Sequence, residues 1–264
     1  MLLPIFGTAP ITMKKISAVI ISFNEERDIG RCLESVMDIV DEVLVLDSFS
    51  NDLTEKICRE KGVRFEQHAF DGYVSQKNRA LKLVTYDYVL SLDADEALSE
   101  EARNSVKMVK EDWSHDGYLF NRRNNYCGHW MRHTSWYPDR KLRLFDRRKA
   151  AWTGMDPHDY IAMSEGSSVS RLKGDLLHWT VRTLEEHKVK TEQFARVSAK
   201  FHFDKGVKAG IGSAAFHSIW RWYREYYILL GFLDGKAGWQ VARFSALYVW
   251  KKYYYLRQLY GSQR

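Results

Sequence analysis

The alternation of apolar runs with helical patterns early in the chain restricts the fold more than any other feature of the sequence. Runs rich in aliphatic and β-branched residues occupy 16–21, 42–47, 63–67 and 86–93. Segments with helical spacing separate them, the first with apolar positions at Ile29, Cys32, Leu33 and Val36, the others at 51–62 and 75–84. Strands that alternate with helices of this length predict βαβ units, and therefore an α/β fold with right-handed crossovers.

Two of the expected helices carry end signals. Asn51 or Asp52 can cap the helix over 51–62, and Gly62 suits its end because glycine tolerates a left-handed backbone. Ser99 precedes a helix expected after the apolar run over 86–93, and that helix has acidic residues in its first turn.

Polar residues follow the apolar runs at the expected carboxyl ends of the strands. They are Ser22, Phe23, Asn24 and Glu25 after the first run, Asp47 at the end of the second, and Asp93 and Asp95 at the end of the run over 86–93. Ligands of parallel α/β sheets bind beyond these ends. If the backbone stays extended, Asp93 and Asp95 point to the same side, and two carboxylates that close repel each other unless a cation lies between them.

The motifs narrow the kind of ligand. No GxGxxG follows the first strand and no GxxxxGK[ST] occurs, which disfavours a dinucleotide-binding dehydrogenase and a P-loop enzyme. The remaining way to bind a phosphate-bearing ligand is a divalent metal (Mg²⁺ or Mn²⁺), held by carboxylates and by phosphate oxygens of the ligand. It would neutralise the charge of a departing diphosphate.

Charge and cysteine content are consistent with such a ligand. The net charge of +6 and the pI near 9.0 favour anionic partners. The three cysteines form no CxxC pair, so we expect neither a disulfide framework nor a structural zinc site. The apolar N-terminal stretch has no preceding positive charge, and no run reaches the roughly 18 apolar residues of a membrane span, so we expect no signal peptide and no transmembrane helix.

Several stretches of the sequence resemble a known family. Four stretches resemble successive blocks of an inverting family 2 glycosyltransferase: AVIISFNEERDIGRCLESV, EVLVLDSFSNDLTEKI, SQKNRAL and YVLSLDADE. That family has the GT-A fold of nucleotide-diphospho-sugar transferases, a Rossmann-like mixed sheet flanked by helices. Four later stretches resemble the bacterial lipopolysaccharide core heptose β-1,4-glucosyltransferases: HWMRHTSWYPDRKLRLF, PHDYI, LLHWTVRTLEEH and GFLDGKAGWQVA. The resemblance covers about residues 16 to 260.

The resemblance implies a role for each candidate residue. Residues 22–25 would surround the uracil and ribose of a nucleotide-sugar, with Asp47 accepting hydrogen bonds from the nucleoside. Lys77 would lie near the nucleotide or its phosphates. Asp93 would touch the ribose or the metal shell, and Asp95 would ligate the metal directly. His178 would be a third metal ligand or a contact to the departing phosphates.

The general base is expected where the family usually has His-Glu and this chain has His158-Asp159. Asp159 is one methylene shorter than the usual glutamate. His158 is therefore the competing assignment, either as the base itself or as a residue that orients Asp159.

The implied activity is metal-dependent transfer of a hexose, glucose from UDP-glucose, onto the inner-core heptose of lipopolysaccharide. The protein would work as a cytoplasmic enzyme, peripheral on the cytoplasmic face of the inner membrane. The alternative function is a non-catalytic protein that keeps the fold and binds an anionic glycolipid or nucleic acid.

We expect three parts in the chain: a flexible N-terminal extension over 1–13, a GT-A domain over 14–205, and a basic, aromatic C-terminal segment over 206–264. The last predicts two amphipathic helices around GFLDGKAG. Trp, Tyr, Lys and Arg together are typical of a helix at a membrane interface with anionic lipid. A helical hairpin packed on the catalytic domain and a dimer interface are the alternatives. No nucleic-acid-binding module is recognisable, so we expect no nucleic-acid partner.

Overall fold

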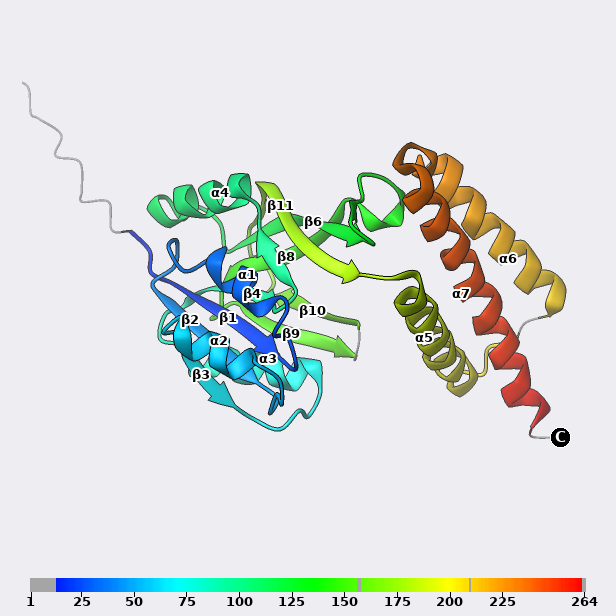
Figure 1. Ribbon diagram of the computed structural model, residues 1–264, viewed down its shortest axis with the longest axis horizontal. Coiled ribbons are helices and arrows are strands. Elements are labelled where there is room, and N and C mark those ends of the chain that lie inside the picture. Colours follow the sequence, from blue (N-terminus) through cyan, green and yellow to red (C-terminus); the bar gives the residue numbers. More distant parts are fainter. Residues whose placement is uncertain (1–12, 156–157, 209, 263–264) are drawn as a thin grey trace, which may run out of the picture. The chain divides into compact units, whose positions relative to one another are not determined.

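The computed structural model describes residues 13–155, 158–208 and 210–262 (Figure 1). The described chain forms two compact units. The first contains residues up to Arg122 and the segment Arg140–His178, and the second contains Arg123–Asp139 and Trp179–Arg264. The extension expected over 1–13 lies outside the described residues, except for Met13.

The first unit contains most of the strands. Its elements, with β6 and β11 running on past its limits, are β1 (Ile16–Ser22), α1 (Ile29–Glu34), β2 (Glu42–Asp47), α2 (Thr54–Glu60), β3 (Arg64–Gln67), α3 (Tyr73–Leu83), β4 (Tyr88–Asp93), β5 (Glu96–Leu98), α4 (Glu100–Glu111), β6 (Gly117–Tyr126), β8 (Asp139–Asp146), β9 (Ala150–Met155), β10 (His158–Met163) and β11 (Val169–Val181).

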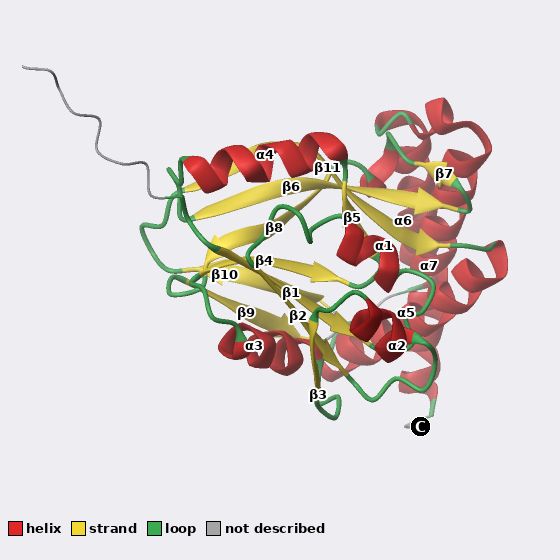
Figure 2. Cartoon of the chain, turned by 60° about the vertical axis from the view of Figure 1, so that its left-hand side comes forward, coloured by secondary structure: helices red, strands yellow, loops and turns green. Residues whose placement is uncertain are grey.

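The main sheet is mixed. Its strand order is β3-β2-β1-β4-β8-β6-β11-β5, and β9 and β10 form a separate antiparallel pair. β1 pairs in parallel with β2 and with β4, as the sequence predicts, whereas β4 pairs with β8 in antiparallel fashion. The expected fold class, an α/β mixed sheet flanked by helices, is confirmed (Figure 2).

Alternation along β1 places its side chains in two different cores. Ile16, Ala18 and Ile20 belong to one buried cluster, together with residues of α1, α2 and α4. Val19 belongs to a second buried cluster, with residues of α3, β9 and β10. Because successive side chains of a strand face opposite ways, the sheet is covered on both faces, which explains the continuous apolar runs in the sequence.

The helix ends differ in detail from the predictions. α2 begins at Thr54, later than the expected start at 51. The Asp52 carboxylate lies just before it and accepts hydrogen bonds from the Thr54 backbone N–H and hydroxyl. Gly62 follows the helix with φ of 67°, as expected for a glycine at that place. α4 opens after Ser99 with Glu100 and Glu101 in its first turn, as predicted, and Ser99 caps it by accepting a hydrogen bond from the Ala102 N–H.

The second unit is mainly helical. It contains β7 (His129–Trp130), η1 (Thr134–Trp136), α5 (Leu184–Asp204), α6 (Ile211–Tyr223), η2 (Arg224–Ile228), η3 (Gly231–Asp234) and α7 (Gly235–Gly261). The two helices expected around GFLDGKAG are therefore present, and α6 lies beside α7 (Figure 1). α5, which we placed with the catalytic domain from the sequence, belongs to this compact unit, and the boundary at residue 205 stays a prediction. Within the described residues, no helix is both long and apolar enough to cross a bilayer.

Candidate active site

The carboxyl ends of three parallel strands meet at one edge of the sheet. The register places Ser22 at the end of β1 opposite Asp47 of β2, and Ile21 opposite Asp93 of β4. The sequence-based expectation that these strand ends converge is thus met by the pairing.

An open cavity of about 600 Å³ lies at this edge, within the first unit. Its volume is in the range of small-molecule sites. The lining residues are Ile21, Ser22, Phe23, Glu25, Ser48, Phe70, Tyr73, Lys77, Asp93, Ala94, Asp95, Arg122, Asp159 and His178. Most of the candidates chosen from the sequence are therefore brought together. Among the described residues, Asn24 and Asp47 are the candidates that do not line the cavity.

Asp47 is fully buried behind the cavity wall. Its carboxylate accepts hydrogen bonds from the Ser22 hydroxyl at 2.8 Å, from the Ser50 N–H at 2.7 Å and from the Gln67 amide at 3.3 Å. These internal donors use the oxygens that were expected to meet the nucleoside. In this arrangement Asp47 fixes the Ser22 side chain at the cavity rim.

Asn24 is exposed beside the rim and has a left-handed backbone, with φ of 55°. Its side-chain oxygen accepts a hydrogen bond from the Asn51 N–H, and its own N–H donates to the Ser50 hydroxyl. These bonds tie the loop after β1 to the loop after β2.

Asp93 is held by two cations. Arg143 Nη2 lies 2.6 Å from Asp93 Oδ2, and Lys77 Nζ lies 2.8 Å from Asp93 Oδ1. Burial alone would raise the pKa of the Asp93 carboxyl, but the charges of Arg143 and Lys77 outweigh it and hold that pKa well below its usual range. Asp93 is therefore a carboxylate whose two oxygens already have cationic partners.

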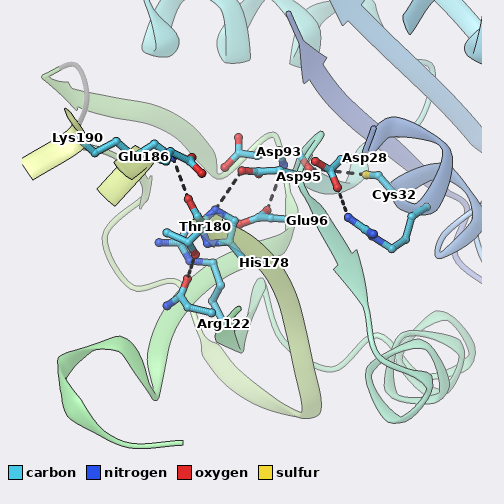
Figure 3. Close-up of polar contacts among 12 residues, drawn as sticks. Asp28, Cys32, Asp93, Asp95, Glu96, Arg122, His178, Thr180, Glu186 and Lys190 are labelled. Atoms are coloured by element: carbon cyan, nitrogen blue, oxygen red, sulfur yellow. Dashed lines mark hydrogen bonds and ion pairs between the residues drawn. The ribbon is translucent and has the colours of Figure 1, made fainter. Parts of the chain in front are cut away.

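The turn after β4 separates Asp93 from Asp95. β4 ends at Asp93, and Ala94 and Asp95 form a turn before β5 begins at Glu96. The strand alternation assumed from the sequence stops there. Asp95 Oδ2 lies 3.2 Å from His178 Nε2, and the two side chains point toward each other in Figure 3.

Arg143 and Glu96 form a buried pair that the sequence analysis missed. Arg143 Nη2 lies 2.7 Å from Glu96 Oε1, and both side chains are almost completely buried. Arg122 adds a second guanidinium 3.3 Å from the same oxygen. Arg143 was not a candidate from the sequence, but it contacts Asp93, which lines the cavity. The available signal was an arginine between Leu142 and Leu144.

Lys77 is only 5% exposed and bridges two carboxylates. Besides Asp93, its ammonium contacts Asp159 Oδ2 at 2.8 Å, and it lies 4.1 Å from the centre of the Trp152 ring. These contacts occupy the ammonium that was expected at the nucleotide or its phosphates. They make Lys77 a link between Asp159 of β10 and Asp93 of β4.

Of the two candidate bases, the structure describes the side chain of Asp159 alone. Asp159 lies mostly buried in β10, opposite Gly154 of β9, and lines the cavity. The His158 side chain lies outside the described residues. The choice between the two residues stays a prediction.

Phe70 and Tyr73 line the cavity without having been candidates. Their rings are 5.0 Å apart with an edge-to-face orientation, and both are exposed. The loop before α3 carries no motif, so two aromatic residues three positions apart were the only signal available in the sequence.

Comparison with known proteins identifies the family. Residues 17–168 match the sequence profile described as Glycosyl transferase family 2, which is more than half of the chain. The chain belongs to glycosyl transferase family 2. This family 2 glycosyltransferase thus has the GT-A fold and the enzyme class that the resemblance implied, and the family favours an enzyme over the alternative of a binding protein.

Relatives of this family 2 glycosyltransferase cover most of its length. An uncharacterised glycosyltransferase of Rickettsia typhi is 28% identical over 86% of this chain and 81% of its own. A protein of Rhizobium meliloti named lipopolysaccharide core biosynthesis glycosyltransferase LpsC is 25% identical over 90% of this chain and 93% of its own.

A solved structure, S. aureus TarS 1–349 in complex with UDP-GlcNAc, is 13% identical with a TM-score of 0.46, covering 95% of this chain and 92% of that chain. Similarity at that level carries no ligand over to this protein.

The donor atoms of this family 2 glycosyltransferase fit a divalent metal with few protein ligands. No cluster of three or more His, Cys, Asp or Glu side chains among the described residues is arranged to hold a metal. The Asp95–His178 pair offers one oxygen and one nitrogen at the cavity, whereas the Asp93 oxygens face cations. One or two protein ligands are enough when phosphate oxygens complete the shell, as is usual for Mg²⁺.

Proposed function

We propose that the first unit transfers a hexose from a UDP-sugar to the hydroxyl of a glycolipid acceptor in a single displacement. The observation that carries this proposal is the cavity at the strand ends, which collects the Asp95–His178 pair, the Ser22–Phe23 rim and Asp159. A pair of candidate metal ligands and a separate carboxylate in one cavity suit a reaction that needs a stabilised leaving group and a base.

Asp95 and His178 would hold the divalent cation, which supplies neutralisation of the charge that develops on the departing diphosphate. Ser22 and Phe23 would contact the nucleoside at the end of β1. Glu25, in the same loop, would complete this part of the donor site. Asn24 and Asp47 would act through hydrogen bonds that fix this rim. Asp93 would keep Lys77 and Arg143 in place beside the cavity through its two ion pairs.

Asp159 would act as the general base. The acceptor oxygen forms a bond to the anomeric carbon while the bond from that carbon to the diphosphate oxygen breaks, and the hydroxyl proton passes to the Asp159 carboxylate. Lys77 would orient Asp159 through its 2.8 Å contact. His158 remains the competing base.

We propose UDP-glucose as the donor and the inner-core heptose of lipopolysaccharide as the acceptor. The Rhizobium meliloti relative named for lipopolysaccharide core biosynthesis supports a glycolipid acceptor, because its similarity extends over 90% of this chain. An acceptor of this kind requires the enzyme to work at the cytoplasmic face of a membrane, peripherally.

A panel of donors tests this proposal. The protein is incubated with UDP-glucose, UDP-galactose, UDP-GlcNAc or GDP-mannose and a heptose-terminated core oligosaccharide, and the products are analysed by mass spectrometry and NMR. The proposal predicts a hexose-extended product from UDP-glucose with inverted anomeric configuration. A product from another donor alone, or retained configuration, contradicts it.

A further inference from the structure

Helix α6 and the turn that follows it carry a series of exposed apolar side chains. Phe216, Ile219, Trp220, Tyr223 and Tyr227 recur three or four positions apart, a spacing that places them on one helix face. Ring contacts connect Trp220 to Tyr223 and Tyr223 to Tyr227. The turn toward α7 adds further exposed residues. We call this set the aromatic face: Phe216, Ile219, Trp220, Tyr223, Tyr227, Ile228, Leu230, Phe232 and Leu233.

The grouping of many exposed apolar side chains along α6 and its turn distinguishes this face from single exposed apolar residues. Single exposed apolar side chains are common on proteins, whereas contiguous patches mark sites of association. Phe216 and Ile219 are 66% and 68% exposed, and Leu233 is 58% exposed.

The exposed charged residues of the segment that carries the aromatic face are of one sign. Between residues 210 and 264, Glu225 and Asp234 are the only acids. Both are buried. The described basic residues of the same segment are Arg221, Arg224, Lys236, Arg243, Lys251, Lys252 and Arg257.

The two acids are buried because they fasten the turn to the loop before β8. Glu225 Oε2 accepts a hydrogen bond from the Ser135 N–H at 2.7 Å, and Arg221 Nε lies 3.1 Å from its other oxygen. Asp234 Oδ2 accepts from the His133 N–H at 2.8 Å. Neither acid of α6, α7 and the turn between them is therefore exposed, and the exposed ionic groups of these described elements are basic. Lys251 of α7 is paired with Glu192 of α5.

We propose that the aromatic face binds the surface of a membrane that contains anionic lipid. Aromatic rings with cations beside them and no exposed acid among the described residues of α6 and α7 match the composition of a helix lying in the interfacial layer of a bilayer. A second copy of this chain would bring like charges together across the interface, which disfavours self-association. This proposal builds on the glycolipid acceptor of the proposed function, and it assigns the surface that meets the acceptor's membrane.

Vesicle binding by the full chain tests the proposal. Phe216→Ser/Ile219→Ser/Leu233→Ser is compared with the matched variant Met108→Ser/Val189→Ser/Val197→Ser, whose residues are also exposed but lie on α4 and α5. Co-sedimentation uses vesicles of phosphatidylglycerol and phosphatidylethanolamine, and vesicles of phosphatidylcholine alone. We expect the first variant to bind the anionic vesicles at least about tenfold more weakly than wild type, since apolar insertion is lost, and the matched variant to bind like wild type.

A charge variant completes the test. Lys236→Gln/Arg243→Gln should lose about fivefold in affinity per basic residue at low salt, and wild-type binding should weaken as salt rises. Lys82→Gln/Lys188→Gln is the control, because these lysines lie on α3 and α5. Equal binding of the aromatic-face variant and its control overturns the proposal, as does absence of binding by wild type. A third result also overturns the proposal. If wild type is a dimer in analytical ultracentrifugation, the aromatic-face variant is a monomer, and neither binds vesicles, the face serves self-association.

The assay separates this proposal from the proposed function. Vesicle binding needs no nucleotide-sugar, and UDP release from a soluble donor needs no membrane. The aromatic-face variant is expected to keep UDP release at the wild-type rate while its transfer to glycolipid in vesicles falls.

Discussion

Lys77 of α3 and Asp159 of β10 contact each other at 2.8 Å although 82 positions separate them in the chain. The same ammonium lies 2.8 Å from Asp93 of β4. The buried Lys77 ammonium therefore connects Asp159, the expected general base, to Asp93, which lines the cavity. Its place against the Trp152 ring leaves it little freedom to move.

Lys77→Met tests this link. Loss of the ammonium frees the Asp159 carboxylate to rotate away from the acceptor, and displacement of a reacting group by about 1 Å can cost roughly 10²-fold in rate. We expect kcat for transfer to fall by about that factor while the KM for the donor changes little. Lys82→Met, an exposed lysine on the same helix, should leave both constants unchanged. An equal rise in KM with unchanged kcat would instead place Lys77 at the donor.

Asp159→Asn keeps the shape of the side chain but removes its ability to accept a proton. Transfer to the acceptor should fall by roughly 10²- to 10⁴-fold. Donor binding, measured by isothermal titration calorimetry with UDP and metal, should stay near wild type. His158→Ala is the comparison, and a crippled His158→Ala beside a mild Asp159→Asn would move the base to the histidine.

Arg143→Met should destabilise the first unit. The change leaves the fully buried Glu96 carboxylate without its 2.7 Å partner, and breaking a buried ion pair costs about 3 to 5 kcal/mol. The contact from Arg122 to Glu96 at 3.3 Å offsets part of this cost. Urea denaturation measures the free energy of unfolding, with Arg140→Met, an exposed change on the same strand, as control. A loss no larger than in the control would mean that the buried pair contributes nothing net.

His187 makes the second unit sensitive to acid. Burial beside Tyr126 and Phe244 lowers the pKa of His187 to about 4, below its ordinary 6.5. Between these two values the unfolded chain binds a proton that the folded chain does not, so stability falls as pH drops through this window. The loss between pH 7 and pH 5 amounts to up to about 2 kcal/mol. In urea denaturation at both pH values, His187→Phe should show a smaller loss, whereas His217→Phe, an exposed change, should behave like wild type.

The fold was largely predictable because its signals are local. The apolar runs that form β1, β2 and β4 are buried on both faces, and this burial produces a pattern that is visible without knowledge of any partner. The meeting of Ser22, Asp47 and Asp93 at one edge followed from the parallel order of these strands.

The site was only partly predictable because its contacts depend on distant residues. Arg143 reaches Glu96 across 47 positions and between different strands, and no spacing in the sequence indicates such a pair. The turn at Ala94 and Asp95 ends the alternation assumed for the acidic stretch, so Asp93 and Asp95 have different partners. Asp47 was chosen for its place at a strand end, but the sequence does not show the donors that surround it.

The release of UDP from UDP-glucose, measured with Mg²⁺ or Mn²⁺ and with EDTA, tests the central claim most directly. Wild type and Asp95→Asn are compared, with Asp112→Asn, an exposed change at the end of α4, as control. We expect metal-dependent release from wild type and from the control. Release by Asp95→Asn should be nearly absent, while its fold, followed by circular dichroism, is unchanged. Undiminished release in EDTA, or wild-type activity in Asp95→Asn, would contradict a metal held at Asp95 and His178.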